Sequence, residues 1–436
     1  MSLMKLEIKK LGINGEGIGY YHRKPVFVRG CFPDEVVDVQ IEKDNSTYYT
    51  AKINKILKVS KYRCKRKCEN EACVSCPLIE MDYEAQLLHK TDIFTESIEK
   101  YSDLENTKIY AIQKNPIEDY RNQLKLPFCL GKRGLSLGTY LNESNYTVPI
   151  RNCYVQNEKL NEVSEKILDV LNQHKVRLFQ KGKAEGVRFM LLRGFGKEYQ
   201  LTLVVSSHCI PDKVYEDVQK IEEVVSIYES VITDRQPKTF FKRDIKHIYG
   251  RKKIKCEMDD FTFFLSPSAF FQLNACQASY MYQLASSYVE EGETVLDAYC
   301  GIGSLTLYLS RKAEKVIGIE SNYQAIADAR KNAEYNRIRN VEFVAGDAAR
   351  KLSEYARKLH FNTIVVDPPR SGLSDDMIAA ILRSRPEKIV YVSCNPTTLA
   401  KNLSELKLQY EVVEITPFDM FSETPLVESV SYLERK

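Results

Sequence analysis

The sequence predicts an α/β protein whose C-terminal part is a doubly wound parallel sheet. Three observations support this fold class. From about residue 260 the chain alternates between strand-like and helix-like segments, a glycine-rich turn follows the first of these strands, and acidic or thiol side chains stand where later strands end. Alternating strands and helices are typical of a parallel sheet covered by helices. A length of 436 residues allows roughly two to four domains.

Composition and charge narrow the class of protein. Hydrophobic residues make up 44% of the chain and charged residues 28%, as in globular proteins. A net charge of +4 is too small to argue for nucleic-acid binding, which would need a local basic patch. No apolar run reaches the ~18 residues that span a bilayer, and the N-terminus lacks the apolar core of a signal peptide. We therefore expect a cytoplasmic protein with no membrane partner, whose twelve cysteines are reduced.

The N-terminal part predicts a small antiparallel β-barrel. Alternating segments such as VVDVQIEK are typical of strands, and glycines recur at short intervals within residues 12–19. A helix is expected at about residues 84–100, and residues from about 120 to 250 have the pattern of a mixed α/β segment with hairpins. We accordingly divide the chain into three parts, residues 1–58, 59–255 and 256–436.

Four closely spaced cysteines are candidate metal ligands. Cys64, Cys68, Cys73 and Cys76 lie within 13 residues in RCKRKCENEACVSCP, a density that core packing explains poorly. Zinc and a [4Fe–4S] cluster both use four thiolates, so the spacing leaves both open. The lysines and arginines of residues 61–67 form a local basic patch, which is either a solvated face or a contact for nucleic-acid phosphates.

The segment from residue 294 to 347 has the pattern of a cofactor site. A strand at Thr294–Ala298 leads into Gly301-x-Gly303 and then Ser304, followed by a helix and a second strand that ends at Glu320. A glycine turn lets a ligand approach the backbone, and an acid about 20 residues later can bind ribose hydroxyls.

Two departures from the dinucleotide fingerprint favour S-adenosylmethionine. Position 306 is Thr instead of a third glycine, and Asp297 stands beside the loop. The Asp297 carboxylate would repel a pyrophosphate but attract the sulfonium and ammonium groups of S-adenosylmethionine. Asp347, after the third strand VEFVAGD, is placed for the adenine edge. A nicotinamide cofactor, or a loop that only turns the chain, are the alternatives.

Three further strand ends carry candidate catalytic groups. FNTIVVDPPRSGLS predicts a fourth strand that ends at Asp367, where the prolines could also simply terminate the strand. IVYVSCNPTTLAKNL predicts a fifth strand followed by Cys394. A thiol at the carboxyl end of a strand lies where open α/β sheets bind ligands, although a small hydrophobe filling a turn also fits. Glu428, between two apolar stretches, is either a solvated rim residue or a general base.

Taken in order, the glycine loop, SPSAFFQLN, DPPR, VSCNPTTLAKNL and VES resemble the RNA uracil-5-methyltransferase family, which makes 5-methyluridine. SCNP together with DPPR is highly specific for this family, whereas the glycine loop alone is weakly so. The resemblance runs from about residue 4 to the C-terminus. One segment, DMFSETPLVES, departs from it, because many members have His-Thr-x-His just before Val-Glu; Glu428 stays in register.

The resemblance implies an architecture for each part of the chain. Residues 256–436 would be a Rossmann-like S-adenosylmethionine-dependent methyltransferase domain. Residues 1–58 would be an OB-like TRAM barrel that binds RNA, and residues 59–255 a small mixed α/β domain that holds a metal cluster and also binds RNA.

The resemblance also assigns catalytic roles, for which the chemistry of uracil gives the reason. Uracil C5 is too weak a nucleophile to take a methyl group from a sulfonium, but a thiolate that adds to C6 creates an enolate with a strongly nucleophilic C5. Cys394 is the expected nucleophile and Glu428 the expected base for the C5 proton. Asp367 would fix the uracil or cofactor end of the cleft. The cofactor-binding residues expected are Gln272, Asp297, Tyr299, Gly301, Gly303, Ser304, Glu320, Asp347 and Asp367.

For the cysteines, the resemblance implies a [4Fe–4S] cluster held by three closely spaced cysteines and a distant fourth, for which IRNCYVQN supplies Cys153. The family's C-x5-C-x2-C becomes C-x4-C-x2-C from Cys68, or C-x8-C-x2-C from Cys64. The expected ligands are Cys68, Cys73, Cys76 and Cys153, with Cys64 as the alternative first ligand.

The resemblance finally suggests a substrate, which is uridine in 23S ribosomal RNA. The near alternative is transfer RNA, whose bacterial enzymes typically lack the barrel and the cluster. An alternative of another class is a non-catalytic RNA-binding iron–sulfur protein, against which the presence of both Cys394 and Glu428 argues. No obligate protein partner is evident, and we expect a monomer.

Overall fold

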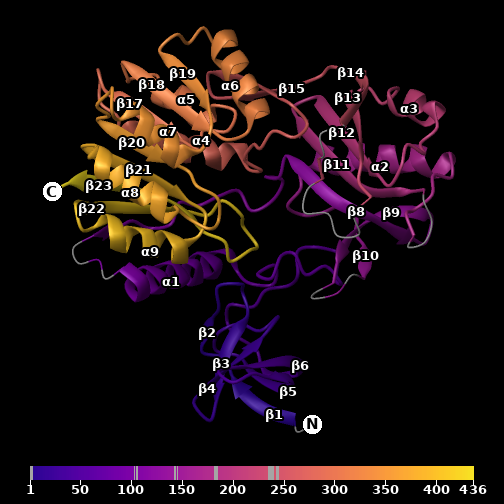
Figure 1. The fold of residues 1–436 in the computed structure, drawn as a ribbon. Coiled ribbons are helices and arrows are strands. Elements are labelled where there is room, and N and C mark those ends of the chain that lie inside the picture. Colours follow the sequence, from indigo (N-terminus) through magenta and orange to yellow (C-terminus); the bar gives the residue numbers. More distant parts are fainter. Residues whose placement is uncertain are drawn as a thin grey trace. The chain divides into compact units, whose positions relative to one another are not determined.

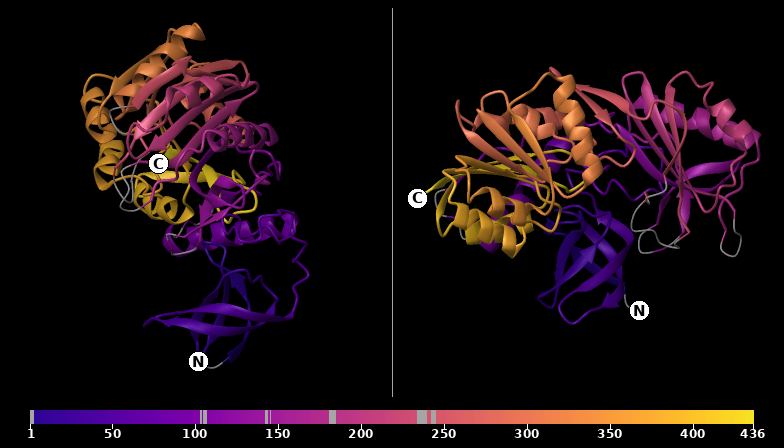
Figure 2. Two further views of the ribbon diagram at one scale, coloured as in Figure 1. Left: turned by 90° about the vertical axis from the view of Figure 1, so that its right-hand side faces the viewer. Right: turned by 45° about the horizontal axis from the view of Figure 1, so that its top comes forward.

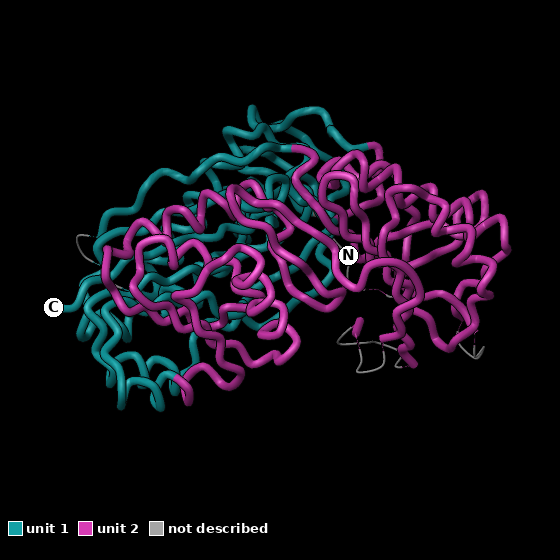
Figure 3. Tube along the Cα trace, turned by 90° about the horizontal axis from the view of Figure 1, so that it is seen from above, with its two compact units in different colours: residues 1–68, 75–117, 352–436 teal, residues 69–74, 118–351 magenta. Residues whose placement is uncertain are grey.

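A computed structural model describes residues 3–102, 104, 107–141, 144, 146–180, 185–233, 240–241 and 245–436. The chain forms two compact units, which Figure 3 shows in different colours. Unit 1 consists of residues 1–68, 75–117 and 352–436, and unit 2 of residues 69–74 and 118–351.

The first part of unit 1 is a strand-rich module (Figure 1). Six strands of its described residues pair in the order β1-β5-β6-β4-β3-β2 around an apolar core that includes Leu6, Val26 and Val37. Gly19 on β3 lies so close to β1 that an added Cβ would be 2.6 Å from the Glu7 carbonyl oxygen. The prediction of a barrel with only antiparallel pairs is wrong in one respect, because β4 and β6 run parallel. The strands are β1 (Leu3–Glu7), β2 (Lys10–Leu11), β3 (Gly17–Tyr21), β4 (Lys24–Val28), β5 (Val36–Asp44) and β6 (Tyr49–Lys58).

The rest of unit 1 combines a long helix with a layered α/β segment. Helix α1 (Tyr83–Ser102) confirms the helix expected at about residues 84–100, and it lies against α9 (Pro396–Leu406) (Figure 1). Among the helices of the described residues, none has both the length and the hydropathy needed to cross a membrane.

The strands of this α/β segment pair within unit 1. Strands β20 and β21 run parallel, β23 runs antiparallel to both β21 and β22, and β22 runs parallel to β7. The elements are β7 (Lys108–Ile109), β20 (Thr363–Val366), α8 (Asp375–Ser384), β21 (Lys388–Ser393), β22 (Tyr410–Phe418) and β23 (Glu428–Arg435).

The first part of unit 2 is a mixed sheet with strand order β10-β9-β8-β11-β12-β13-β14 among the described residues. Helices α2 and α3 pack on one of its faces, where their apolar residues join those of the sheet in one core (Figure 2). The elements are β8 (Gln123–Gly131), β9 (Gly134–Tyr140), β10 (Thr147–Pro149), α2 (Glu158–Gln173), β11 (Val187–Phe195), β12 (Glu198–Val205), α3 (Asp212–Val218), β13 (Val224–Val231) and β14 (Ile245–Gly250).

The second part of unit 2 alternates strands and helices as the sequence predicts. After the hairpin β15 (Ile254–Met258) and β16 (Phe261–Leu265), strands β17, β18 and β19 pair in parallel. The apolar runs of β17 and β18 are buried, as expected of parallel strands covered on both faces, whereas in β19 only Phe343 is buried. The predicted strand at Thr294–Ala298 and the strand end at Glu320 are confirmed. The elements are α4 (Ala275–Ser287), β17 (Thr294–Ala298), α5 (Ser304–Leu309), β18 (Lys315–Glu320), α6 (Tyr323–Tyr335), β19 (Val341–Ala345) and α7 (Ala348–Tyr355).

Candidate active site

Cys394 lies in the short turn between β21 and α9. Asn395 caps the helix, since its side-chain oxygen accepts hydrogen bonds from the backbone N–H groups of Thr397 at 3.0 Å and Thr398 at 3.5 Å. Pro396 starts the helix, a position where its missing N–H costs nothing. The Asn395 amide also donates to the Arg370 carbonyl oxygen at 3.2 Å, which ties the turn to the DPPR loop. The thiol therefore has a fixed place at the end of a strand.

Strand pairing brings Glu428 and Asp367 to the same edge as Cys394. In the antiparallel pair of β21 and β23, Ser393 is opposite Ser429, so the next position along places Cys394 across from Glu428. Strand β20 runs parallel to β21, and Asp367 follows its last residue. We call Cys394, Glu428, Asp367 and Arg370 the catalytic cluster.

The electrostatics of the catalytic cluster tune its proton affinities. Burial raises the pKa of the Cys394 thiol to about 11, and the Glu428 and Asp367 carboxyl groups add to the effect while Arg370 opposes it. Burial, with a smaller contribution from Asp367, raises the pKa of Glu428 to about 8, again against Arg370. Burial raises the pKa of Asp367 to about 7. A carboxyl group that titrates near neutral pH beside a thiol is suited to general acid–base work.

The Glu428→Gln substitution should lower the pKa of the Cys394 thiol, because it removes a negative charge that disfavours the thiolate. At pH 9 Glu428 is ionised in the unaltered protein, and we expect iodoacetamide to alkylate Cys394 roughly threefold faster in the variant. Mass spectrometry of the Cys394 peptide measures this rate. Glu434→Gln, at the other end of β23, is the matched control. Equal rates in all three proteins would contradict the proximity of Glu428 to the thiol.

Eight of the nine residues predicted to bind the cofactor lie in unit 2, seven of them at or just after the ends of β17 to β19. Asp297 is only 1% exposed, and the Thr306 hydroxyl donates to its Oδ2 at 2.5 Å. Thr306 thus orients Asp297 from the position where the dinucleotide fingerprint has glycine. Gly303 has φ +82°, and an added Cβ would lie 2.9 Å from the Phe343 ring, whereas Gly301, with φ +56°, faces open space. The loop is tightly packed on one side and open on the other.

Tyr299, Glu320 and Asp347 lie around this loop. Tyr299 has φ +68°, and burial raises its pKa with a further contribution from the Asp347 carboxylate. The Glu320 carboxylate accepts a hydrogen bond from the Asn322 backbone at 2.8 Å. The Gly346 N–H donates to the Glu320 carbonyl oxygen at 2.9 Å, which joins the ends of β18 and β19. Three adjacent strands therefore present carboxylates at one edge.

Gln272 is held in place by residues that carry no functional signal in the sequence. It is buried, and the Asn122 side chain donates to its carbonyl oxygen at 2.9 Å, while the Asn122 N–H donates to the Leu273 carbonyl oxygen at 3.0 Å. The buried Arg193 guanidinium donates to the Ala269 carbonyl oxygen at 2.6 Å. Asn122 and Arg193 precede Gln272 by long stretches of chain, so no local motif could reveal them.

The structure thus groups the predicted residues in two sets. Asp367, counted from the sequence among the cofactor residues, belongs to the catalytic cluster with Cys394 and Glu428. Arg370 received no role from the sequence, and its only signal was its place in the DPPR motif. The other eight predicted cofactor residues form the cofactor set: Gln272, Asp297, Tyr299, Gly301, Gly303, Ser304, Glu320 and Asp347.

The described residues of the cysteine-rich segment do not form a preorganised metal-binding site. Within the described ranges, no group of three or more His, Cys, Asp or Glu side chains is arranged to hold a metal ion. In unit 2, however, Asn70 donates to the Arg151 carbonyl oxygen at 2.5 Å and accepts from the Arg151 N–H at 2.8 Å. These two bonds hold the segment that contains Cys73 beside the segment that contains Cys153.

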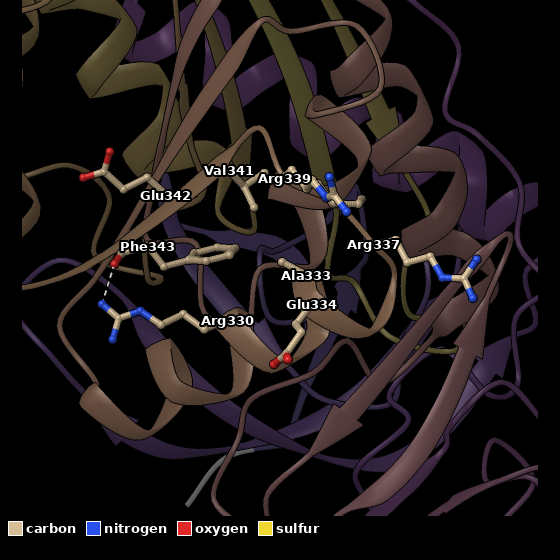
Figure 4. A pocket seen from close by; sticks show the side chains of 9 residues that line it. Arg330, Ala333, Glu334, Arg337, Arg339, Val341, Glu342 and Phe343 are labelled. Carbon is tan, nitrogen blue, oxygen red and sulfur yellow. Dashed lines mark hydrogen bonds between the residues drawn. The ribbon is translucent and has the colours of Figure 1, made fainter.

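A separate pocket lies between α6 and β19 (Figure 4). Arg330, Arg337 and Arg339 line it together with two glutamates, and Arg330 donates to the Phe343 carbonyl oxygen at 2.7 Å. None of the predicted site residues lines this pocket, so we do not place the active site there.

Comparison with known proteins decides the family. A family model described as tRNA (Uracil-5-)-methyltransferase matches residues 82–436, and a TRAM domain model matches residues 2–53. The chain belongs to the uracil-5-methyltransferase family. It is therefore an S-adenosylmethionine-dependent RNA methyltransferase with the methyltransferase α/β fold and an N-terminal TRAM domain, as the sequence motifs indicate.

Relatives of this uracil-5-methyltransferase family member align along nearly the whole chain. A Bacillus cereus protein described as an uncharacterized RNA methyltransferase is 34% identical over 98% of this chain and 96% of its own length. A Caldanaerobacter subterraneus protein with the same description is 35% identical over 99% of this chain and 98% of its own. The crystal structure of Pyrococcus abyssi tRNA (uracil-54, C5)-methyltransferase with S-adenosyl-L-homocysteine matches with a TM-score of 0.79 and 28% identity over 99% of both chains.

Proposed function

We propose that this protein transfers a methyl group from S-adenosylmethionine to C5 of a uridine in RNA through a covalent adduct between Cys394 and C6. The observation that carries the proposal is the catalytic cluster, in which a thiol at a strand end lies beside carboxyl groups whose pKa values approach neutral. This arrangement has both the nucleophile and the base that the chemistry of uracil C5 requires.

Three residues of the catalytic cluster, Cys394, Glu428 and Arg370, take part in the bond changes of the proposed reaction. The Cys394 thiolate adds to C6, and the electrons of the C5–C6 double bond move toward O4 as an enolate. Bound S-adenosylmethionine supplies the methyl group, which C5 then takes. The Glu428 carboxylate removes the C5 proton, the C5–C6 double bond forms again, and the thiolate leaves. Arg370 favours the ionised forms of both Cys394 and Glu428.

The cofactor set has the charges that S-adenosylmethionine needs. The Asp297 carboxylate would attract the sulfonium and ammonium groups, the Glu320 carboxylate would accept from ribose hydroxyls, and Asp347 would bind the adenine edge. Gln272, Tyr299 and the loop residues Gly301, Gly303 and Ser304 would complete the site.

We propose 23S ribosomal RNA as the substrate, with transfer RNA as the second candidate. The second candidate is favoured by the match to the Pyrococcus abyssi transfer-RNA enzyme, which covers 99% of both chains and hence includes the barrel. The presence of the barrel therefore does not argue against a transfer-RNA substrate. Mapping 5-methyluridine by mass spectrometry in both RNAs, after treating RNA from a strain that lacks the gene, would decide. A product in transfer RNA alone would overturn the ribosomal assignment.

We further propose that Cys68, Cys73, Cys76 and Cys153 hold a [4Fe–4S] cluster. The donor set of four thiols fits such a cluster, and the Asn70–Arg151 bonds support the proximity of Cys73 and Cys153. The cluster would supply covalent links between these segments, and so contribute folding free energy.

Anaerobically purified protein should therefore be brown and contain iron instead of zinc. Cys68→Ser should reduce the soluble yield and the RNA affinity severely, and Cys64→Ser only mildly, because Cys64 lies outside the ligand set. S-adenosylmethionine affinity should change less than RNA affinity in both. Iron analysis, filter binding and calorimetry measure these effects. If Cys64→Ser is severe and Cys68→Ser is mild, Cys64 is the ligand instead of Cys68. Stoichiometric zinc without iron would contradict the [4Fe–4S] cluster.

A further inference from the structure

The loop that delivers Glu428 is itself buried. Residues 419–427, here called the hairpin loop, connect β22 to β23, and Glu428 is the first residue of β23. All nine side chains are buried except those of Phe421 and Leu426, which are partly exposed. The Phe418 and Glu428 positions pair across the hairpin, so the course of the loop fixes the start of β23.

Helix α1 anchors the beginning of this loop. The Asp419 carboxylate forms an ion pair with Lys90 in which both side chains are fully buried. The Tyr83 hydroxyl donates to the second Asp419 oxygen at 2.9 Å, and the Lys90 ammonium also donates to the Phe421 carbonyl oxygen at 3.0 Å. A buried ion pair whose other donors and acceptors are also hydrogen-bonded allows the attached loop little movement.

Glu423 anchors the middle of the loop from two sides. Its side chain is fully buried, and its φ of +66° lies in the left-handed region that residues other than glycine rarely adopt. Gln86 of α1 donates to Glu423 Oε2 at 2.8 Å and accepts from the Glu423 N–H at 3.0 Å. Lys67 of the cysteine-rich segment donates to Glu423 Oε1 at 2.9 Å, and the Leu78 N–H donates to the Glu423 carbonyl oxygen at 3.1 Å.

These contacts explain how a loop in an unfavourable backbone conformation can persist. A strained residue keeps its conformation only when its surroundings determine it several times over, and such residues concentrate at functional sites. The contacts come from segments more than 300 residues earlier in the chain, as the separations of 337 for Gln86 and 356 for Lys67 show. They converge on the segment DMFSETPLVES, which runs from Asp419 into the start of β23.

We propose that Lys67 and Gln86 are positioning residues for Glu428, so that the cysteine-rich segment and α1 together set the geometry of proton removal from C5. The inference rests on the proposed function, in which Glu428 is the base. A base must lie within hydrogen-bond reach of its proton, and a displacement of about 1 Å can cost on the order of 100-fold in rate. Release of Glu423 would free the hairpin loop and let the Glu428 carboxyl move relative to Cys394.

The test uses the full-length protein with a uridine-containing transcript that the unaltered protein methylates. Lys67→Met removes the cation, and Lys67→Arg keeps it. Gln86→Met breaks the contacts from α1 to Glu423 without touching the cysteine-rich segment. Lys65→Met is the control, because it removes the same charge from an exposed neighbouring lysine. It shows how far the loss of one positive charge by itself weakens RNA binding. The measurements are kcat, KM for RNA, the S-adenosylmethionine dissociation constant, and the protein–RNA adduct on a denaturing gel.

For Lys67→Met and Gln86→Met we expect kcat to fall roughly 10- to 100-fold while the covalent adduct accumulates, because methyl transfer continues but proton removal slows. The S-adenosylmethionine dissociation constant should not change. Lys67→Arg should restore most of kcat, and Lys65→Met should change at most KM, without adduct.

A merely stabilising network gives a different result. Folded variants that turn over at the original rate, or that lose rate and thermal stability without accumulating adduct, would overturn the inference. A defect in Lys67→Met that Gln86→Met does not share would also overturn it, and if Gln86→Met does not fold, the comparison of Lys67→Met with Lys67→Arg decides. Failure of the unaltered protein to make 5-methyluridine would instead reject the proposed function itself.

Discussion

Cys394→Ala is expected to lower turnover by a factor on the order of 10⁴ or more while leaving the affinity for S-adenosylmethionine unchanged. The thiol acts on the uracil ring, and without it C5 stays too weakly nucleophilic to take the methyl group. The residues proposed for the cofactor lie at or just after the ends of β17 to β19 and in the segment of Gln272, and they do not include Cys394. Mass spectrometry of 5-methyluridine measures turnover, and calorimetry measures cofactor binding.

Cys276→Ala is the matched control, because Cys276 is an exposed cysteine on α4, outside both groups of site residues. It should turn over normally. Normal turnover by Cys394→Ala would remove the covalent mechanism, and loss of S-adenosylmethionine binding along with turnover would show that the substitution disturbs more than the nucleophile.

Glu428→Gln should fail at a later step. The amide cannot take the C5 proton, so addition and methyl transfer proceed but elimination does not, and we expect turnover to fall roughly 10²- to 10⁴-fold. The variant should remain attached to its RNA and give a band of lower mobility on a denaturing gel. The double variant Cys394→Ala/Glu428→Gln should give no such band, because the bond to C6 is missing.

Glu434→Gln, on the same strand, controls for loss of a carboxylate from β23. It should show neither the adduct nor a fall in turnover. If Glu428→Gln makes product at a near-normal rate and forms no adduct, Glu428 is not the base. It would then be a solvated residue at the rim of the cleft, the alternative stated in the sequence analysis.

The sequence predicted those parts of the fold and site that local patterns determine. The strand Thr294–Ala298, the end of the next strand at Glu320 and the helix near residues 84–100 follow from apolar runs bounded by glycine turns or polar residues. The strand ends at Asp367 and Cys394 followed from the prolines behind them. Pairing of β21 with β23 then places Glu428 opposite Cys394, in agreement with the register of the VES motif.

Contacts between segments that are distant in the chain could not be predicted from the sequence. The Lys90–Asp419 pair and the Gln86–Glu423 contacts join residues more than 300 positions apart, and a lysine or glutamine in a helix carries no sign of its partner. The parallel pairing of β4 with β6 was missed because alternation predicts strands but not their neighbours.

Release of tritium from uridine is the most direct test of methylation at uracil C5. A transcript labelled with tritium at uracil C5 is incubated with the protein and S-adenosylmethionine carrying a labelled methyl group, and both labels are followed over time. The account predicts that methyl groups enter the RNA and tritium enters the water in equal amounts, with 5-methyluridine as the product and neither signal from Cys394→Ala. Methyl incorporation without tritium release would place the methyl group on another atom and contradict the account.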